Sequence, residues 1–275
     1  MTKNTQIKIF MDETGKNKNK ISIFGGISIP INIYNYESIQ LLENRLQKME
    51  LKFHFSDYNN YDLSTYTELI DTFSTVSQFI TMNAIAWKQN DLASNLLTAG
   101  GIYSQNNYKE MVYSKIPERV AYGLLRNHSA FSTLVADLSI ENSSEYQSIK
   151  LNEVIKTQVN VHALYRSDLF MINKSKLVPK NKQIGLEFTD MLIGMTAFIM
   201  EHAFSDTSVL SSRQKDKAEL TLLALDKLDN IFSNINLFEL SPKEQLEKIE
   251  FNTYIRLFKS NFSKQNNPVH SVPPK

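Results

Sequence analysis

Three aspartates in this chain lie at or inside strongly apolar stretches, where a charged side chain is costly to bury. They belong to separate stretches: Asp12 follows Ile7–Met11, Asp137 closes the run Thr133–Ala136, and Asp190 lies within Ile184–Phe204. Carboxylate oxygens are the ligands that Mg²⁺ and Mn²⁺ prefer. Two such cations held about 3.5–4 Å apart can promote hydrolysis of a phosphodiester bond. Clustered aspartates repel one another and raise their own pKa values, so a bound divalent ion would stabilise them. The three aspartates therefore predict a metal site if the fold brings them together.

Each aspartate also has a simpler structural interpretation. Asp12 and Asp137 could merely begin turns, and Asp190 could form the polar edge of a buried helix. For Asp190 the structural interpretation is less convincing, because its apolar neighbours leave little exposed helix surface. These neighbours are Phe188, Met191, Leu192, Ile193 and Met195. A function that needs all three aspartates explains their positions together.

The element that would position Asp12 is an N-terminal β-hairpin. Ile7–Met11 and Ile21–Ile29 have strand composition, and the lysine-rich segment Lys16–Lys20 predicts the turn between them. Asp12 then stands at the end of the first strand. Loops at the ends of buried strands commonly carry functional groups.

The rest of the chain predicts strands alternating with helices. Expected strands cover Phe79–Trp87, Thr133–Asp137 and Asp168–Ile172, and a loop covers Ser94–Asn107. Expected helices cover Asn35–Glu50, Asp62–Gln78, Pro117–Leu125, Glu145–Tyr165, Ile184–Phe204, Lys215–Ile235 and Ser241–Phe262, the last opened by the capping-box spacing of Ser241–Glu244. This order predicts an α/β fold with a mixed sheet, an antiparallel N-terminal hairpin and helices on both faces.

The balance of charges excludes a positive field over the whole protein. Thirty lysines and arginines balance 29 aspartates and glutamates in 275 residues, so affinity for a polyanion must come from a local patch or a bound metal. The absence of cysteine fits a reducing compartment, and no secretory signal pattern opens the chain, so we expect a cytoplasmic protein. Charged residues interrupt the longest apolar stretch, Ile184–Phe204, so we expect no membrane partner.

Local basic residues are candidates for binding substrate phosphates. They are Lys52, Lys174, Lys176, Lys180 and Arg119, and several belong to a predicted basic loop, Lys174–Lys182, before the helix bearing Asp190. Lysines in turns are often simply solvated. His54, between two phenylalanines and near Asp57, could order a water or be a structural group.

Several short motifs also follow one another in a distinctive order. They are Phe10-Met11-Asp12-Glu13-Thr14-Gly15, Phe24-Gly25-Gly26, Glu50-Leu51-Lys52-Phe53, Arg119–Leu125, Val135-Ala136-Asp137 with Ser139 and Glu141, and Asp190-Met191-Leu192-Ile193-Gly194. This order resembles the domain-of-unknown-function 3800 family, which is regarded as having a ribonuclease H-like fold. The resemblance covers roughly residues 5–205.

The resemblance implies a metal site and a ribonuclease H-like domain over residues 1–205. Outside the resemblance, the helical pattern of residues 206–262 predicts an extension packed on that domain, and residues 263–275, which have no core pattern, are expected to be a disordered tail. Asp12, Asp137 and Asp190 would bind Mg²⁺ or Mn²⁺, with Glu50 as the candidate fourth ligand. Glu187 stands where the family usually has glutamine, and it could add a ligand or face solvent.

The leading hypothesis is therefore a metal-dependent nuclease acting on RNA, DNA or a hybrid. The resemblance further suggests a role in phage defence or a mobile element. An actin-like ATPase is a weaker alternative, because the chain has no second glycine-rich phosphate loop. A function of a different class is a non-catalytic module that binds nucleic acid or protein. The apolar residues of its C-terminal helices would form either a homodimer surface or part of the chain's own core. These residues are Leu220, Leu223, Leu228, Phe232, Ile255 and Phe258.

Overall fold

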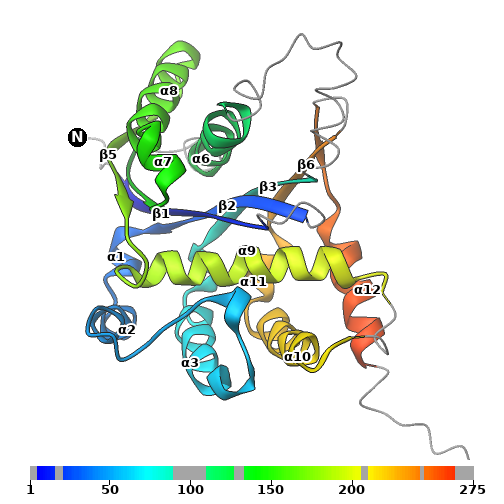
Figure 1. The fold of residues 1–275 in the computed structure, drawn as a ribbon. Helices are drawn as coiled ribbons and strands as arrows, with labels where there is room; N and C mark the ends of the chain where they lie inside the picture. The colour runs from blue at the N-terminus through cyan, green and yellow to red at the C-terminus, as the bar shows by residue number, and fades with distance from the viewer. Residues whose placement is uncertain are drawn as a thin grey trace, which may run out of the picture.

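The centre of the protein is one seven-stranded mixed sheet. The computed structural model describes residues 5–15, 21–88, 110–126, 133–205, 210–241 and 245–263. Its strands are β1 (Thr5–Thr14), β2 (Ile21–Pro30), β3 (Thr81–Lys88), β4 (Leu134–Glu141), β5 (Phe170–Val178), β6 (Asn236–Leu240) and β7 (Leu246–Lys248). Their order across the sheet is β5-β4-β1-β2-β3-β6-β7, and Figure 1 labels β5, β1, β2, β3 and β6 of this series. The β1–β2, β2–β3 and β6–β7 pairs are antiparallel, and the β1–β4, β4–β5 and β3–β6 pairs are parallel.

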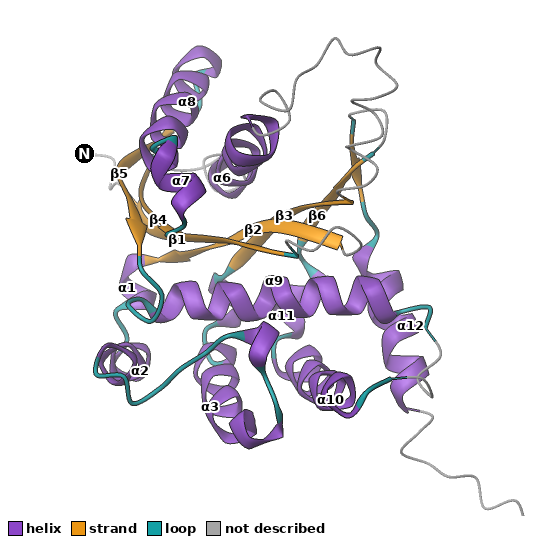
Figure 2. Ribbon diagram, viewed as in Figure 1, coloured by secondary structure: helices purple, strands orange, loops and turns teal. Residues whose placement is uncertain are grey.

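Helices cover both faces of this sheet (Figure 2). One face carries α6 (Ile116–Arg126), α7 (Ser144–Ser148) and α8 (Leu151–Arg166). The other carries α9 (Ile184–His202) together with α1 (Ile31–Tyr34), α2 (Glu37–Gln47), α3 (Leu63–Ser74), α10 (Ser212–Lys227), α11 (Asp229–Ser233) and α12 (Phe251–Ser263). Each face has its own hydrophobic core. A short 3₁₀ turn, η1 (Phe55–Asp57), precedes α3.

The long helix α9 packs against β1 and β2 and is buried from Ile184 to Met200. A helix that is apolar around its whole circumference is stable only in such a position. The helix approaches the sheet closely at Gly25 of β2, where an added Cβ would lie 2.5 Å from Cγ2 of Ile193. This tight packing fixes the distance between α9 and the strands on which it lies.

The first turn of α9 is held by residues from other helices. Its N-cap residue, Gln183, makes no capping hydrogen bond through its side chain. Instead, the Ile184 N–H donates to Oε2 of Glu43 over 3.2 Å, and the Gly185 N–H donates to the hydroxyl of Tyr34 over 3.4 Å. That hydroxyl in turn donates to Glu43. These two amides at the helix start, which have no partner within the helix, thus find acceptors on α1 and α2, and this helps to set the position of α9 along its axis.

The outer edge of β5 is hydrogen-bonded by side chains of α8. The Ile172 N–H donates to Oδ1 of Asn160 over 2.7 Å, and Nδ2 of Asn160 donates back to the Ile172 carbonyl over 3.0 Å. Lys156 and Asn152, one and two turns earlier on α8, donate to further β5 carbonyls. The helix therefore satisfies backbone groups that an edge strand would otherwise present to solvent.

These features confirm the predicted α/β class, with an antiparallel N-terminal hairpin, a mixed sheet and helices on both faces. Within the described ranges, no helix is both long and apolar enough to cross a membrane.

Predicted strands were too short at their C-terminal ends, including β1, which ends at Thr14 and not at Met11. Strand β4 continues four residues beyond Asp137 and ends at Glu141. Strand β5 extends to Val178, so Lys174 and Lys176 belong to a strand and not to a loop. In β4, polar residues alternate with apolar ones after Asp137, and this alternation continues the strand. In β5, the consecutive polar residues Lys174–Lys176 belong to the strand because they pair with β4. The helix predicted over Glu145–Tyr165 is also divided, into α7 and α8.

The segment predicted as a helical extension also contributes strands. Residues 236–240 and 246–248 form β6 and β7 at the edge of the sheet, and α12 begins at Phe251, ten residues after the predicted Ser241. The apolar residues proposed for a dimer surface lie in the chain's own core: Leu220, Leu228, Phe232 and Phe258 are buried, and Leu223 and Ile255 pack against them. The turn Lys16–Lys20, the loop Ser94–Asn107, the capping-box residues 242–244 and the tail from 264 onward lie outside the described residues.

Candidate active site at the ends of two parallel strands

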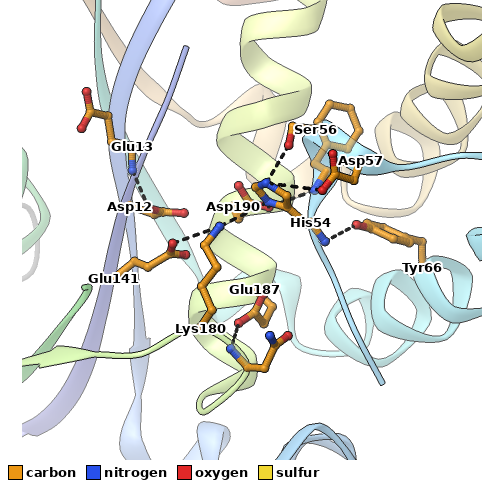
Figure 3. Close-up of polar contacts among 12 residues, drawn as sticks. Asp12, Glu13, His54, Ser56, Asp57, Tyr66, Glu141, Lys180, Glu187 and Asp190 are labelled. Atoms are coloured by element: carbon orange, nitrogen blue, oxygen red, sulfur yellow. Dashed lines mark hydrogen bonds and ion pairs between the residues drawn. The ribbon is translucent and has the colours of Figure 1, made fainter. Parts of the chain in front are cut away.

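A cavity of about 550 Å³ lies where β1 and β4 end beside the middle of α9. Its volume is in the range of small-ligand sites, about 300–1,000 Å³. Its wall contains charged residues from several elements: Asp12, Glu13, His54, Glu141, Lys180, Asp190, Glu201 and Lys217. A close-up of its polar contacts shows side chains from β1, β4 and α9 converging (Figure 3).

Asp12 reaches this cavity because of the pleat of β1. Phe10 belongs to the core on the α9 side, and Met11 belongs to the core on the opposite side, so Asp12 faces α9. The side chain is buried, and its Oδ1 accepts the Glu13 N–H over 2.7 Å. Burial, followed by the charges of Glu141 and Asp190, raises the pKa of Asp12 well above its usual range. Its environment therefore disfavours an isolated negative charge.

Glu141 is the neighbour of Asp12 on the adjacent strand. Met11 pairs with Ile140 in the parallel β1–β4 register, and each strand then places its next residue at the cavity. Ile140 lies in the core of the opposite face, so Glu141, like Asp12, faces α9. Glu141 is 8% exposed, and its Oε1 lies 3.1 Å from Nζ of Lys180.

Asp190 approaches from α9 and links that helix to η1. Its Oδ2 accepts the Phe55 N–H over 3.0 Å and lies 3.5 Å from Nδ1 of His54. The residue is 7% exposed. Its interaction with both the backbone and the side chain of this segment holds His54 beside the carboxylates.

His54 bridges Asp190 and a serine. Its Nε2 lies 2.7 Å from Oγ of Ser56, and its backbone N–H donates to the hydroxyl of Tyr66 over 2.8 Å. The hydrogen bond with Asp190 raises the pKa of His54, against the opposing effect of burial. The imidazole is thus held in one orientation at the cavity wall.

Lys180 supplies positive charge within the carboxylate cluster. It lies in the connection between β5 and α9, and its Nζ is 3.4 Å from Nδ1 of His54 as well as 3.1 Å from Glu141. Burial favours the neutral amine, but the charges of Glu141, Asp190 and Asp12 outweigh it and raise the pKa of Lys180. The ammonium extends among these groups in Figure 3.

Glu187 is a further buried carboxyl, one turn before Asp190. It is 2% exposed, and its Oε1 accepts the Asn181 N–H over 2.7 Å. Burial raises the pKa of Glu187 to about 7, with smaller contributions from Glu141 and Asp190. Of the two alternatives considered from the sequence, a position facing solvent is excluded.

The donor chemistry of Asp12, Glu141 and Asp190 fits a divalent cation. All three offer carboxylate oxygens, and a cation among them would offset the burial and the carboxylate repulsion that raise the pKa of Asp12. As the side chains stand, no group of three or more histidine, aspartate or glutamate residues in the described part of the chain is arranged to hold a metal ion. The cluster is instead partly neutralised by Lys180.

The structure brings two of the four predicted metal ligands together. Asp12 and Asp190 line the cavity, whereas Asp137 and Glu50 do not. Asp137 pairs in register with Lys8, about 13 Å along the strand from Glu141 at 3.3 Å per residue. Glu50 follows α2 and lies 3.8 Å from Arg45, with half of its side chain exposed. The carboxylate at the end of β4 is therefore Glu141.

Of the predicted phosphate-binding residues, Lys180 lines the cavity. Lys52 is exposed outside it, and Lys174 and Lys176 are exposed on β5. Arg119 is exposed on α6, which covers the opposite face of the sheet. Lys217 of α10, which the sequence did not single out, also lines the cavity, and its Nζ donates to the Ser56 carbonyl over 3.0 Å.

No protein-family model matches this chain, and no curated protein matches it. A solved structure of the complex of PCNA with ribonuclease HII from Archaeoglobus fulgidus contains a chain that aligns with it. The alignment has a TM-score of 0.33 and 10% sequence identity, and it covers 84% of this chain and 92% of that chain. We base no inference on a similarity at this level.

Proposed function

We propose that this chain is a divalent-metal-dependent nuclease of the ribonuclease H-like, domain-of-unknown-function 3800 type. The observation that supports the proposal is the convergence of three buried carboxylates, Asp12, Glu141 and Asp190, from three elements at one cavity. Buried carboxylates that lie close together are unfavourable without a counter-charge. The presence of three such carboxylates at one cavity is better explained by a cation-dependent function than by a contribution to folding stability.

In this proposal Asp12, Glu141 and Asp190 hold Mg²⁺ or Mn²⁺. A bound divalent cation would activate water and stabilise the leaving oxygen of a phosphodiester. The protein itself contributes orientation, because α9 fixes Asp190 against the sheet and the Phe55 N–H fixes its Oδ2. His54 holds Ser56 at the cavity wall. The ammonium groups of Lys180 and Lys217 lie at the cavity wall, where they would contact substrate phosphates once a bound cation offsets the carboxylates.

Cleavage of labelled single-stranded RNA, duplex DNA and an RNA–DNA hybrid tests this function. Each substrate would be incubated with Mg²⁺ or Mn²⁺ and the wild type, Asp12→Asn or Asp190→Asn. Asp137→Asn is the matched control, because it makes the same chemical change on the same face of the sheet but away from the cavity. We expect metal-dependent cleavage by the wild type and by Asp137→Asn, and its loss in the other two variants.

A non-catalytic module that binds nucleic acid or protein is the competing function. Folded wild-type protein that binds the same substrates without cutting them, and whose melting temperature is unchanged by either cation, would favour that alternative. Equal cleavage by the wild type, Asp12→Asn and Asp190→Asn would show that the activity does not depend on this cluster.

A role in phage defence is part of the proposal and rests on the family resemblance alone. It predicts that cells expressing the wild-type chain resist infection better than cells expressing Asp190→Asn at the same protein level. Equal plaque counts for the two strains would contradict it.

A further inference from the structure

The carboxylate cluster contains an internal cation in the form of Lys180. Its Nζ lies 3.1 Å from Oε1 of Glu141 and 3.4 Å from Nδ1 of His54, which itself lies 3.5 Å from Asp190. The ammonium is therefore placed among the carboxylates that would bind a metal. Two cations competing for the same oxygens exclude one another through their mutual repulsion.

We infer that Lys180 is a built-in competitor of the divalent cation: its ammonium neutralises the cluster in the metal-free protein and leaves Glu141 when a metal binds. This inference deepens the proposed function and rests on it. It assigns Lys180 a regulatory role at the site, because the affinity for metal then depends on how readily the ammonium is displaced.

The local structure allows the side chain to move while its backbone stays in place. Lys180 lies in the short connection between Val178, the last residue of β5, and Ile184, the first of α9. The next residue, Asn181, is tied by its N–H to the buried Glu187. The Lys180 side chain itself is 45% exposed. A flexible four-carbon stem with one end anchored and the other near solvent can withdraw its charge without unfolding the loop.

Glu141 is the carboxylate whose pairing would change. Of the residues in the cluster, it is the one with a direct ion pair to Lys180. Asp12 and Asp190 interact with the ammonium through their charges. Without metal, loss of the Lys180 charge should therefore leave the negative charge of the three carboxylates less neutralised. When a divalent cation is added, the same loss should strengthen its attraction to them.

Binding of Mn²⁺ alone, measured by isothermal titration calorimetry and by the shift in melting temperature, tests the inference. The variants are Lys180→Met, which removes the charge, and Lys180→Arg, which retains it. Lys182→Met is the matched control, because Lys182 is an exposed lysine two residues away that does not line the cavity. We expect Lys180→Met to bind Mn²⁺ at least about tenfold more tightly than wild type, because the repulsion between the Lys180 ammonium and the metal ion at short range is removed.

The thermal measurement gives a second readout that does not depend on catalysis. We expect Lys180→Met to melt at a lower temperature than wild type without metal and to show a larger rise when Mn²⁺ is added. Lys180→Arg and Lys182→Met should follow the wild type in both measurements. If Lys180→Met fails to fold without metal, folding on addition of Mn²⁺ supports the inference, and failure to fold with Mn²⁺ overturns it.

The outcomes separate this inference from the proposed function. Equal or weaker Mn²⁺ binding by folded Lys180→Met, with clear binding by wild type, would overturn the competition but retain the metal site. No Mn²⁺ binding by either protein would overturn both.

Discussion

Glu141 stands beside Asp12 across the parallel β1–β4 pair, one position beyond the partners Met11 and Ile140. Both side chains face α9, where Asp190 completes the carboxylate cluster. This relationship depends on strand register, so a carboxylate at another position of β4 cannot substitute for Glu141.

Glu141→Gln should strongly reduce metal-dependent cleavage, whereas Asp137→Asn should retain it. The amide keeps the size of Glu141 but loses the charge, and we expect the cleavage rate to fall by more than about 100-fold, beyond the loss that changes around a metal site usually cause. Single-turnover cleavage at saturating Mn²⁺ would measure it. A larger loss in Asp137→Asn than in Glu141→Gln would contradict the assignment of the cluster.

Glu187 should make the metal-free protein less stable as the pH rises. Its folded-state pKa is raised from 4.5 to about 7, so between these values the folded state holds a proton that the unfolded state has lost. Stability therefore falls as pH increases through this window, by roughly 3 kcal/mol for this one group. Glu187→Gln should remove that contribution while keeping an oxygen that can accept the Asn181 N–H.

The measurement is the free energy of unfolding in urea at about pH 5 and about pH 8 with a chelator present, for wild type and Glu187→Gln. The wild type should lose more stability between the two pH values. The prediction would be wrong if both proteins lost the same amount, because Glu187 would then titrate alike in the folded and unfolded states.

Asp190→Asn should lower the pKa of His54. The hydrogen bond and charge of Asp190 hold this pKa above 6.5 in the wild type, so the protonated imidazole stabilises the fold at acidic pH, and that stabilisation disappears as pH rises through the raised pKa. NMR titration of the imidazole C–H signals would measure the change. His162 serves as an internal reference, because its Nδ1 lies 2.8 Å from Glu118 and away from the cavity. Equal shifts in both histidines would indicate a global rearrangement.

Glu43→Ala should destabilise the protein through α9. The change leaves the Ile184 N–H and the buried Tyr34 hydroxyl without their carboxylate partner. An unsatisfied buried polar group costs about 1–3 kcal/mol, and we expect a loss of this size in urea unfolding. Asn44→Ala is the control, since Asn44 is the exposed neighbour of Glu43 on α2. Similar losses in the two variants would argue against a capping role for Glu43.

The places of Asp12 and Asp190 at the cavity could be predicted because Asp12 directly follows an apolar run and Asp190 lies inside one. Glu141 was not singled out as a ligand because β4 was expected to end at its first charged residue, Asp137. The alternation of Leu138 and Ile140 with polar residues was the available signal that the strand continues. Which polar residue reaches the cavity is set by pairing with β1, a contact between segments more than 100 residues apart. Sequence periodicity carries no information on that register.

The other missed features are also non-local. Glu50 lies on an exposed surface beside Arg45 because α2 packs where its apolar face finds the core, not where Glu50 would meet the aspartates. The strand β6 is only five residues long, and it is stabilised by its pairing with β3. His54 was noted from the sequence, but its contact with Asp190 depends on the docking of η1 against α9. In each case, the position of the residue or strand depends on tertiary contacts, which cannot be predicted from local composition.

The hydrogen bonds from α8 to the edge of β5 have a consequence for assembly. An open strand edge is a template on which another chain can add a strand, which leads to aggregation or domain exchange. Here an incoming strand would have to displace both hydrogen bonds between Asn160 and Ile172 before it could form its own. Extension of the sheet beyond β5 is therefore opposed, and partner molecules are directed to other surfaces of the protein.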